Sequence, residues 1–368
     1  MADFTLLPDG GMSWLDASGP ESHVVLSTRI RLARNLQGMA FTVRSNDADR
    51  ETALEMVLAA GRQTLVLRDG AVFRMDRLDR LDRQVLHERH LVSKELAGLE
   101  RDGQVRRASA LFTTGDGGVM VNEEDHLRLQ SLRSGFAPAP AYADVERLDG
   151  ELGARLPFAF HPEFGYLTAC PTNAGTGLRA SVLIHLPGLV LTKEIAKVLQ
   201  GLSQVGLTFR GLYGEGSEVV GNFFQLSNQT TLGKSEEDLL DHLGKIVRQV
   251  IEYEERAREV LVRDAPAVIA DKVWRAYGLL RYARSLSFEE TMNLLSGVRL
   301  GVGLGLIPDL SLYTLNKLLV YTQPAHLAQL EARALSDPDL PLSRATYVRR
   351  LLDDDAARGP RAAPDRTL

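Results

Sequence analysis

The apolar positions in the first two thirds of the chain follow both helix-like and strand-like spacings. Glu51–Leu67 has helical spacing, and the glycine-rich turn between Leu111–Thr113 and Val119–Val121 is typical of a β-hairpin. Short apolar runs predict three further strands, at Val182–Leu186, Leu207–Arg210 and Asn222–Leu226. This part of the chain is therefore expected to mix α and β structure.

A long amphipathic helix follows. Ser235-Glu-Glu-Asp238 has the form of a capping box, and apolar residues then recur at helical spacing as far as Ile251. From Pro266 the strand signals fade, and helices are predicted near 266–284, 288–300, 311–321, 324–333 and 343–352. We therefore expect an α+β domain at 1–264 and an all-helical domain at 265–352. Residues 353–368 lack periodicity and predict a disordered tail.

Composition narrows the class of protein. The 368 residues are 44% hydrophobic and 25% charged, with a net charge of −5. These values exclude wholesale disorder and argue against bulk attraction to nucleic acid or an anionic membrane. The N-terminus does not resemble a signal peptide, and the longest apolar stretch, Val182–Leu191, is too short to span a bilayer. With a single cysteine and no internal disulfide, the chain fits the cytoplasm.

The common catalytic motifs are incomplete. Gly233-Lys234-Ser235 resembles the end of a phosphate-binding loop, but Asn228 stands where the first glycine belongs. His87-Glu-Arg-His90 has two residues between its histidines, whereas the zinc-protease motif has three. The glycines of Leu300–Gly305 lack dinucleotide-binding spacing and indicate close packing of helices. No dedicated metal site is predicted.

Two segments place charged residues where packing does not require them. In Ser27-Thr-Arg-Ile-Arg, Arg29 and Arg31 are two residues apart and so share one face of a strand. This favours an anion-binding face, because guanidinium groups bind phosphate oxygens in pairs; a solvated edge strand is the alternative. Asn122-Glu-Glu-Asp-His-Leu-Arg128 is either a helix N-terminus with favourable charges or a carboxylate cluster that orients a cationic substrate.

Two glycine-rich segments carry further candidates. Cys170-Pro-Thr-Asn-Ala-Gly-Thr-Gly-Leu-Arg179 puts the only cysteine on a turn-rich loop near arginines, which favours the thiolate. The alternative is a small buried hydrophobic residue. Arg210-Gly-Leu-Tyr-Gly-Glu-Gly-Ser-Glu218 places an arginine at a strand end, before a loop that carries Glu215. That loop either closes over a substrate or is a plain surface loop.

Together, and in this order, the four segments resemble the signatures of the phosphagen (guanidino) kinases. Cys170–Arg179 departs from the family signature at Thr172 and Ala174, where the family has Ser and Leu. Ordinary phosphagen kinases carry a helical domain before the catalytic domain, whereas here a helical region follows it. That layout, with Val298-Arg-Leu-Gly301 and Thr322-Gln-Pro-Ala-His326, is similar to the bacterial McsB-type protein-arginine kinases over roughly residues 10 to 350.

The resemblance implies an antiparallel sheet flanked by helices, followed by helices. It implies direct in-line transfer of the γ-phosphoryl group of ATP, carried with Mg²⁺, to arginine side chains of proteins, with a role in protein quality control and stress response. Glu124 and Glu215 would hold the acceptor guanidinium and Glu124 is the preferred base. Cys170 would orient that group; a covalent phosphate on Cys170 is the minority alternative.

The ATP-binding residues implied by the resemblance are Ser27, Thr28, Arg29, Ile30, Arg31, His90, Arg128, Arg179, Ala180, Ser181, Val182, Leu183, Arg210, Gly211, Leu212, Tyr213, Gly214 and Glu215. By sequence alone, His90 is equally well explained as a surface helix residue.

The family's phosphoarginine-sensing motif, Arg-Asp-x-x-Arg-Ala, is degenerate here. The corresponding stretch is Leu340-Pro-Leu-Ser-Arg-Ala345, so only Arg344 and Ala345 remain. Leucine and proline side chains cannot pair with a phosphate, and we expect this sensing to be lost while catalysis persists. The resemblance also suggests a homodimer, a zinc-binding activator protein and a Clp-type protease as partners. The alternative functions are a kinase of free arginine or another small guanidino compound, and a non-catalytic adaptor for phosphoarginine proteins.

Overall fold

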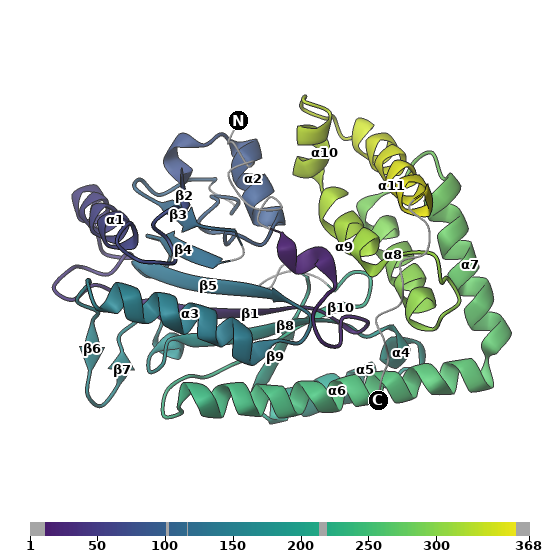
Figure 1. Cartoon of the computed structure of the whole chain (residues 1–368), viewed down its shortest axis with the longest axis horizontal. Helices are drawn as coiled ribbons and strands as arrows, with labels where there is room; N and C mark the ends of the chain where they lie inside the picture. The colour runs from purple at the N-terminus through teal and green to yellow at the C-terminus, as the bar shows by residue number, and fades with distance from the viewer. Residues whose placement is uncertain (1–11, 101–102, 116, 213–218, 358–368) are drawn as a thin grey trace.

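An antiparallel sheet forms the centre of the protein (Figure 1). The computed structural model describes residues 12–100, 103–115, 117–212 and 219–357, and within them the sheet has eight strands in the order β2-β3-β4-β5-β1-β8-β10-β9. A separate hairpin pairs β6 with β7. The strands are β1 (Val25–Arg34), β2 (Ala71–Arg74), β3 (Ala110–Thr113), β4 (Gly117–Val121), β5 (Leu127–Ser134), β6 (Phe160–His161), β7 (Gly165–Tyr166), β8 (Leu178–His185), β9 (Leu207–Arg210) and β10 (Phe223–Asn228).

Helices α1, α3 and α6 cover one face of the sheet, α2 packs on the other face beside β2–β4, and the C-terminal helices gather at one end. The helices are α1 (Asp47–Gly61), α2 (Arg80–Glu88), α3 (Pro138–Gly153), α4 (Pro187–Leu191), α5 (Ile195–Gln204), α6 (Glu236–Asp264), α7 (Pro266–Tyr282), α8 (Phe288–Gly303), α9 (Leu312–Tyr321), α10 (Pro324–Leu330) and α11 (Asp339–Ala357). Short 3-10 helices are η3 (Ser13–Asp16), η4 (Met75–Arg77) and η5 (Pro171–Asn173). Among the helices of the described residues, none combines the length and the apolar character that crossing a membrane requires.

The two faces of the sheet differ in chemistry because side chains alternate along each strand. On one face Ile30 and Leu32 of β1 join a hydrophobic core, which α3 and α6 close. On the other face the strand register sets Arg31 of β1 opposite Arg179 of β8. Arg29 and Arg31 therefore share a face, as predicted. Because β1 lies between β5 and β8, the edge-strand alternative is wrong.

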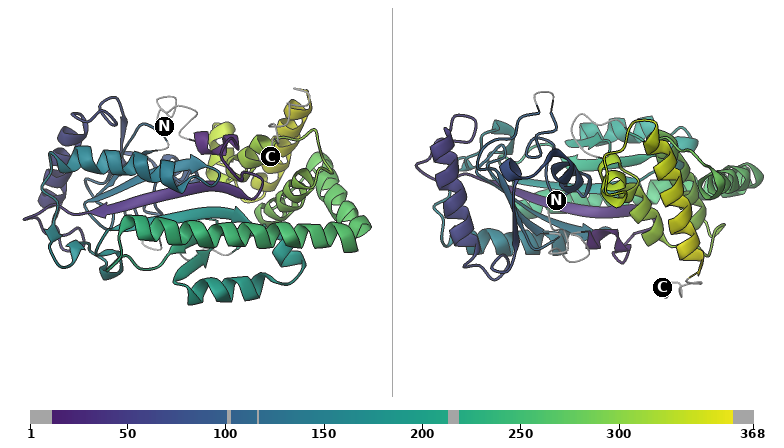
Figure 2. Two further views of the ribbon diagram at one scale, coloured as in Figure 1. Left: turned by 60° about the horizontal axis from the view of Figure 1, so that its bottom comes forward. Right: turned by 90° about the horizontal axis from the view of Figure 1, so that it is seen from above.

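Helix α6 connects the sheet to the helical region. Its N-terminus carries the predicted capping box, in which the Ser235 hydroxyl accepts the Asp238 N–H. The helix ends at Asp264 and α7 begins at Pro266, so the boundary expected at 264 falls at this break. Figures 1 and 2 show α7–α11 gathered at the end of the sheet that α6 reaches. The fold is therefore α+β with an antiparallel sheet and a helical C-terminal region, as expected.

Two helix ends differ from the sequence-based expectation. Helix α1 stops at Gly61, short of Leu67, because the Thr64 hydroxyl donates to the Gly61 carbonyl and accepts the Leu67 N–H, which turns the chain. Helix α11 continues to Ala357, so 353–357 do not belong to a disordered tail. There the Asp355 carboxylate accepts the N–H and the hydroxyl of Ser311 at the start of α9. Residues 358–368 lie outside the described residues.

Candidate active site

A cavity of about 810 Å³ opens on the charged face of the sheet. Strands β1, β8, β9 and β10 form its floor, and the turn before β5 and the loop before β8 form its sides. It brings together most of the predicted charged and nucleophilic residues: Arg29, Arg31, His90, Glu124, Arg128, Cys170, Arg179 and Arg210. These residues come from segments far apart in the sequence; the sheet register brings the strand arginines together, and loops at the ends of strands and helices add the others.

The arginines on β1 and β8 form a cluster of mutually repelling cations. Arg29 donates to Gln225 Oε1 at 3.3 Å, and Arg179 donates to Ser227 Oγ at 3.2 Å. Burial, followed by the charges of Arg179 and Arg128, lowers the pKa of Arg29 to about 10. Burial and the same neighbours together with Arg29 also lower the pKa of Arg31.

Arg31 carries a buried donor that is available to an anion. Its Nε is buried and has no hydrogen-bond partner among the described residues. Such an orphaned donor costs free energy unless a ligand satisfies it. A polyanion such as a nucleotide triphosphate would satisfy it and relieve the repulsion between the arginines.

The acidic segment is a tight turn between β4 and β5, so the alternative of a helix N-terminus is wrong. Asn122 has a left-handed backbone, with φ of 57°, and its N–H donates to the His126 carbonyl at 2.9 Å. Its side-chain amide donates to the carbonyls of Arg50 and Ala108, which fixes the turn to neighbouring elements. This turn directs Glu123 and Glu124 into the cavity.

Two carboxylates share one arginine in this turn. Arg128 donates to Glu123 at 2.7 Å and to Glu124 at 2.9 Å. Burial opposes ionisation of Glu123, but Arg128, the Glu124 N–H, the Ser93 hydroxyl and Arg31 outweigh it, and the pKa of Glu123 falls. Burial raises the pKa of Glu124 despite Arg128. Glu123 is therefore a fixed anion, whereas Glu124 holds its proton more readily, which suits a proton acceptor.

Cys170 borders the cavity next to η5. It is partly buried, and its Sγ lies 3.0 Å from the Thr172 hydroxyl. Asp125 anchors this loop to the acidic turn, because one carboxylate oxygen accepts the Ala169 N–H and the Asn35 amide, each at 2.6 Å. Asp125 thus fixes where Cys170 lies relative to Glu124.

His90 is only partly exposed and lies outside α2, so its interpretation as a surface helix residue is wrong. It follows the end of α2 in a left-handed conformation, with φ of 61°, and its ring packs edge-on against Trp14 at 5.4 Å. Burial, and then Arg29 and His87, lower its pKa well below the ordinary value. His90 borders both the main cavity and a small extension of about 20 Å³, which Ser27, Ser181, Leu183 and Leu212 also line.

Several residues of the predicted nucleotide motif have side chains outside the cavity. Ile30, Ala180 and Val182 belong to the hydrophobic core on the opposite face. Thr28 is buried and donates to the Gly135 carbonyl at 2.7 Å. Gly211 follows β9 directly, and the predicted Tyr213, Gly214 and Glu215 lie outside the described residues.

Sequence reasoning gave no role to three residues that complete the site. Ser93 donates to the Glu123 carboxylate at 2.7 Å, Arg106 donates to the Glu123 carbonyl, and Gln225 accepts from Arg29. One signal for Gln225 is the alternation along β10, where Gln225 and Ser227 interrupt the apolar positions. Ser93 and Arg106 lie in irregular segments, where no periodicity marks them.

The two residues that remain of the sensing motif, Arg344 and Ala345, both pack inside the helical region. Arg344 is buried and donates to the backbone carbonyls of Thr322 and Leu286, at 2.8 and 2.9 Å. Burial lowers its pKa. Ala345 is fully buried in the core of the helical region. Arg344 is thus committed to holding α11 against its neighbours.

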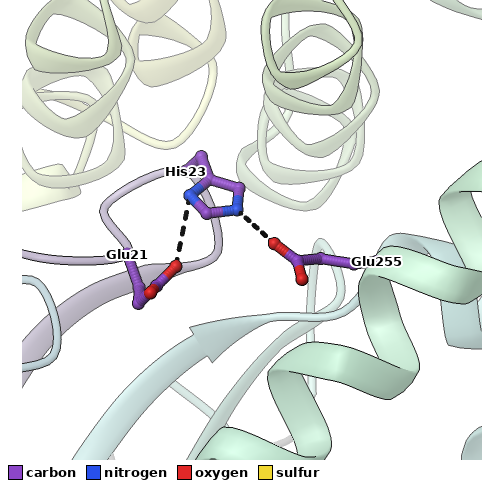
Figure 3. Close-up of side chains that lie close together, drawn as sticks. All are labelled: Glu21, His23 and Glu255. Atoms are coloured by element: carbon purple, nitrogen blue, oxygen red, sulfur yellow. Dashed lines mark hydrogen bonds and ion pairs between the residues drawn. The ribbon is translucent and has the colours of Figure 1, made fainter. Parts of the chain in front are cut away.

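A second group of titratable side chains lies away from the cavity. His23 Nε2 lies 3.0 Å from Glu255 of α6, and its Nδ1 lies 3.8 Å from Glu21 (Figure 3). The imidazole stands between the two carboxylates, with a different nitrogen facing each, and all three side chains are at least one-third exposed. This arrangement ties the segment before β1 to α6.

Comparison with known proteins agrees with this geometry. Residues 54–257 match the C-terminal catalytic domain of the ATP:guanido phosphotransferases, and residues 266–362 match the C-terminal domain of the protein-arginine kinase McsB. A protein-arginine kinase of Symbiobacterium thermophilum is 45% identical over 342 residues, which cover 92% of this chain and 96% of the relative. One of Bacillus cereus is 42% identical over 341 residues, or 92% and 95% of the two chains.

Solved structures agree on the fold. The duplicated taurocyamine kinase of Schistosoma mansoni with bound transition-state analogue components has a TM-score of 0.58 and 28% identity, and the match covers 69% of this chain and 35% of that one. Lombricine kinase has a TM-score of 0.55 and 23% identity, and the match covers 66% and 70% of the two chains. The chain therefore belongs to the ATP:guanido phosphotransferase family and, within it, to the protein-arginine kinases.

Proposed function

We propose that this chain transfers the γ-phosphoryl group of ATP directly to arginine side chains of proteins. The observation that carries the proposal is a cavity in which a cluster of mutually repelling arginines, with the Arg31 Nε orphaned, lies beside Glu124 and Cys170. A cationic cluster suits the triphosphate, and a carboxylate with a raised pKa suits the guanidinium.

In the proposed step, an Nη atom of the acceptor arginine attacks the γ-phosphorus. The new N–P bond forms as the bond to the β,γ-bridging oxygen breaks, and ADP leaves with that electron pair. A guanidinium stays protonated near neutral pH, so the proton must leave as the N–P bond forms. Glu124 accepts it, while Arg29, Arg31 and Arg179 bind the phosphate oxygens.

Arg128 interacts both with the arginine cluster and with the carboxylates of the acidic turn. In the structure it donates to Glu123 and Glu124. We propose that it turns toward the phosphates when ATP binds, which frees Glu124 for the acceptor. Mg²⁺ is proposed to arrive with the nucleotide. Cys170 orients the acceptor without a covalent phosphate.

Protein acceptors are preferred to free arginine because the similar chains named protein-arginine kinase match over nearly their whole length. A role for Glu215, a homodimer, an activator protein, a Clp-type protease and a role in quality control stay predictions.

The test is phosphorylation by the purified chain with Mg-ATP, separately on an unstructured protein and on free arginine, followed by phosphorus NMR for an acid-labile N–P signal. A signal on protein alone is expected. A signal on free arginine only would establish the small-guanidino kinase, and ATP-independent binding without turnover would establish the adaptor.

Glu124→Gln should lower kcat by at least about 100-fold. Glu252→Gln, which changes an exposed carboxylate on α6, should not.

A further inference from the structure

The helical region contacts the last turn of α2, directly before His90. Glu88 ends α2 and is buried, with 4% of its surface exposed. Its carboxylate accepts the N–H groups of Ala325 and His326, at 3.0 and 3.1 Å, and lies 2.7 Å from His326 Nδ1. Within the catalytic domain, Gln84 also donates to it, at 3.2 Å. One carboxylate from the catalytic domain thus satisfies the start of α10.

The His326 ring closes a second contact with the same turn. Arg89 donates from Nε to His326 Nε2 at 3.1 Å. Because Arg89 can only donate, Nε2 must accept, and the ring proton lies on Nδ1 and points to Glu88. Burial lowers the pKa of His326 and so favours this neutral form. The Tyr321 ring packs against the imidazole at 5.1 Å.

His90 lies one residue beyond Arg89, in a backbone conformation that its own sequence does not favour. A left-handed conformation is uncommon for a residue other than glycine and persists only where the surroundings impose it. The His90 N–H donates to the His87 carbonyl inside the final turn of α2. Any shift of that turn would therefore move the imidazole that borders the cavity.

We infer that His326 is a positioning residue for the nucleotide site: through Glu88 and Arg89 it fixes the end of α2 and thereby His90. The inference rests on the proposed function, since it assumes that the cavity next to His90 binds the nucleotide. It gives a role to Thr322-Gln-Pro-Ala-His326, which the reaction itself does not use. The helical region thus supports the nucleotide end of the cavity from outside, through the last turn of α2.

The test compares His326→Ala and His326→Asn with Ser296→Ala in the full chain. Ser296 is a buried polar residue of α8 that bonds His185 and Asn222 at 2.8 Å and lines neither part of the cavity. Its loss removes contacts between the two regions without touching α2. Asparagine at 326 keeps a donor near the Nδ1 position but cannot reach Arg89.

For each variant, the affinity for Mg-ADP is measured by calorimetry, the KM for ATP and kcat are measured with a protein acceptor, and the urea midpoint is measured. We expect His326→Ala to weaken Mg-ADP binding and raise the KM for ATP at least fivefold, with a smaller change in kcat. His326→Asn should retain part of the Mg-ADP affinity that His326→Ala loses. If His326→Ala does not fold, His326→Asn takes its place in the comparison. Ser296→Ala should lower the urea midpoint alone.

Two results would overturn the inference. One is unchanged Mg-ADP affinity in His326→Ala with a urea midpoint as low as that of Ser296→Ala, which would make the contact merely structural. The other is absence of Mg-ADP binding by the unaltered chain, which would remove the nucleotide site itself. If the unaltered chain binds Mg-ADP but phosphorylates no protein, the proposed function fails, and the Mg-ADP affinities still decide the inference.

Discussion

Arg29→Met should stabilise the ligand-free protein while it impairs catalysis. The pKa of Arg29 falls from its ordinary value to about 10 in the folded protein, mainly through burial and the charges of Arg179 and Arg128. At 1.36 kcal/mol per pKa unit, the folded state disfavours the cation by about 3 kcal/mol. Methionine fills similar apolar space without charge. It forfeits the hydrogen bond to Gln225, which is worth about 1 kcal/mol. We expect a net gain of about 1–2 kcal/mol in the free energy of unfolding.

The matched control is Arg34→Met on the same strand. Arg34 is 1% exposed and donates from Nε and Nη2 to both oxygens of Asp149, at 3.0 and 2.8 Å. Its loss leaves a largely buried carboxylate unpaired, which costs about 3–5 kcal/mol. The two substitutions should therefore move stability in opposite directions.

The assay is urea denaturation followed by circular dichroism, without ligand and with saturating inorganic tripolyphosphate. Tripolyphosphate should stabilise the unaltered protein more than Arg29→Met, because the anion relieves a repulsion that the variant lacks. If Arg29→Met were as destabilised as Arg34→Met, the arginine cluster would be structural and the reasoning about an anion site would be wrong.

Three further predictions concern the acceptor side and the effect of pH. Cys170→Ser should keep kcat within about tenfold, because serine can still bond Thr172; loss of all turnover in quenched-flow assays would favour a covalent phosphate. Asp125→Ala should raise the KM for the protein acceptor severalfold and leave the KM for ATP nearly unchanged, since it releases the loop of Cys170; equal changes in both values would contradict this.

Burial lowers the pKa of His185, with Arg299 and Arg258 adding to the shift, and its Nδ1 has no partner among the described residues. Below the unfolded-state pKa of about 6.5 the unfolded chain binds more protons. The free energy of unfolding should therefore fall by up to about 1.4 kcal/mol per pH unit as the pH drops from 6.5, and less in His185→Asn. Urea midpoints at pH 7.5, 6.5 and 5.5 measure it, and a constant midpoint would refute it.

The sequence predicted the elements well where the signal was local. The capping box of Ser235 and the alternation of Arg29 and Arg31 each lie within a few residues, and both are found as expected. The acidic turn was ambiguous because three consecutive acids suit a helix start as well as a turn. Only the pairing of β4 with β5 decides between them.

The contacts that complete the site join residues far apart in the chain. Glu88 and His326 are separated by 238 positions, and no local pattern marks either as the partner of the other. In the sequence, Asp125 is only one of three consecutive acids. Its role in anchoring the Cys170 loop depends on the Ala169 N–H, which is distant in the chain. Such roles follow from packing between elements, which sequence periodicity does not encode.

The arginines of β1 lie on two different faces of the sheet, because side chains alternate along a strand. Arg29 and Arg31 occupy one face, repel each other and leave a donor orphaned, which is unfavourable for folding. Arg34 occupies the other face and has its donors satisfied by Asp149 and by backbone carbonyls. The same residue type therefore costs stability at two positions and provides it at the third. That contrast, more than the number of arginines, is the reason for proposing that phosphate binds on the charged face of the sheet.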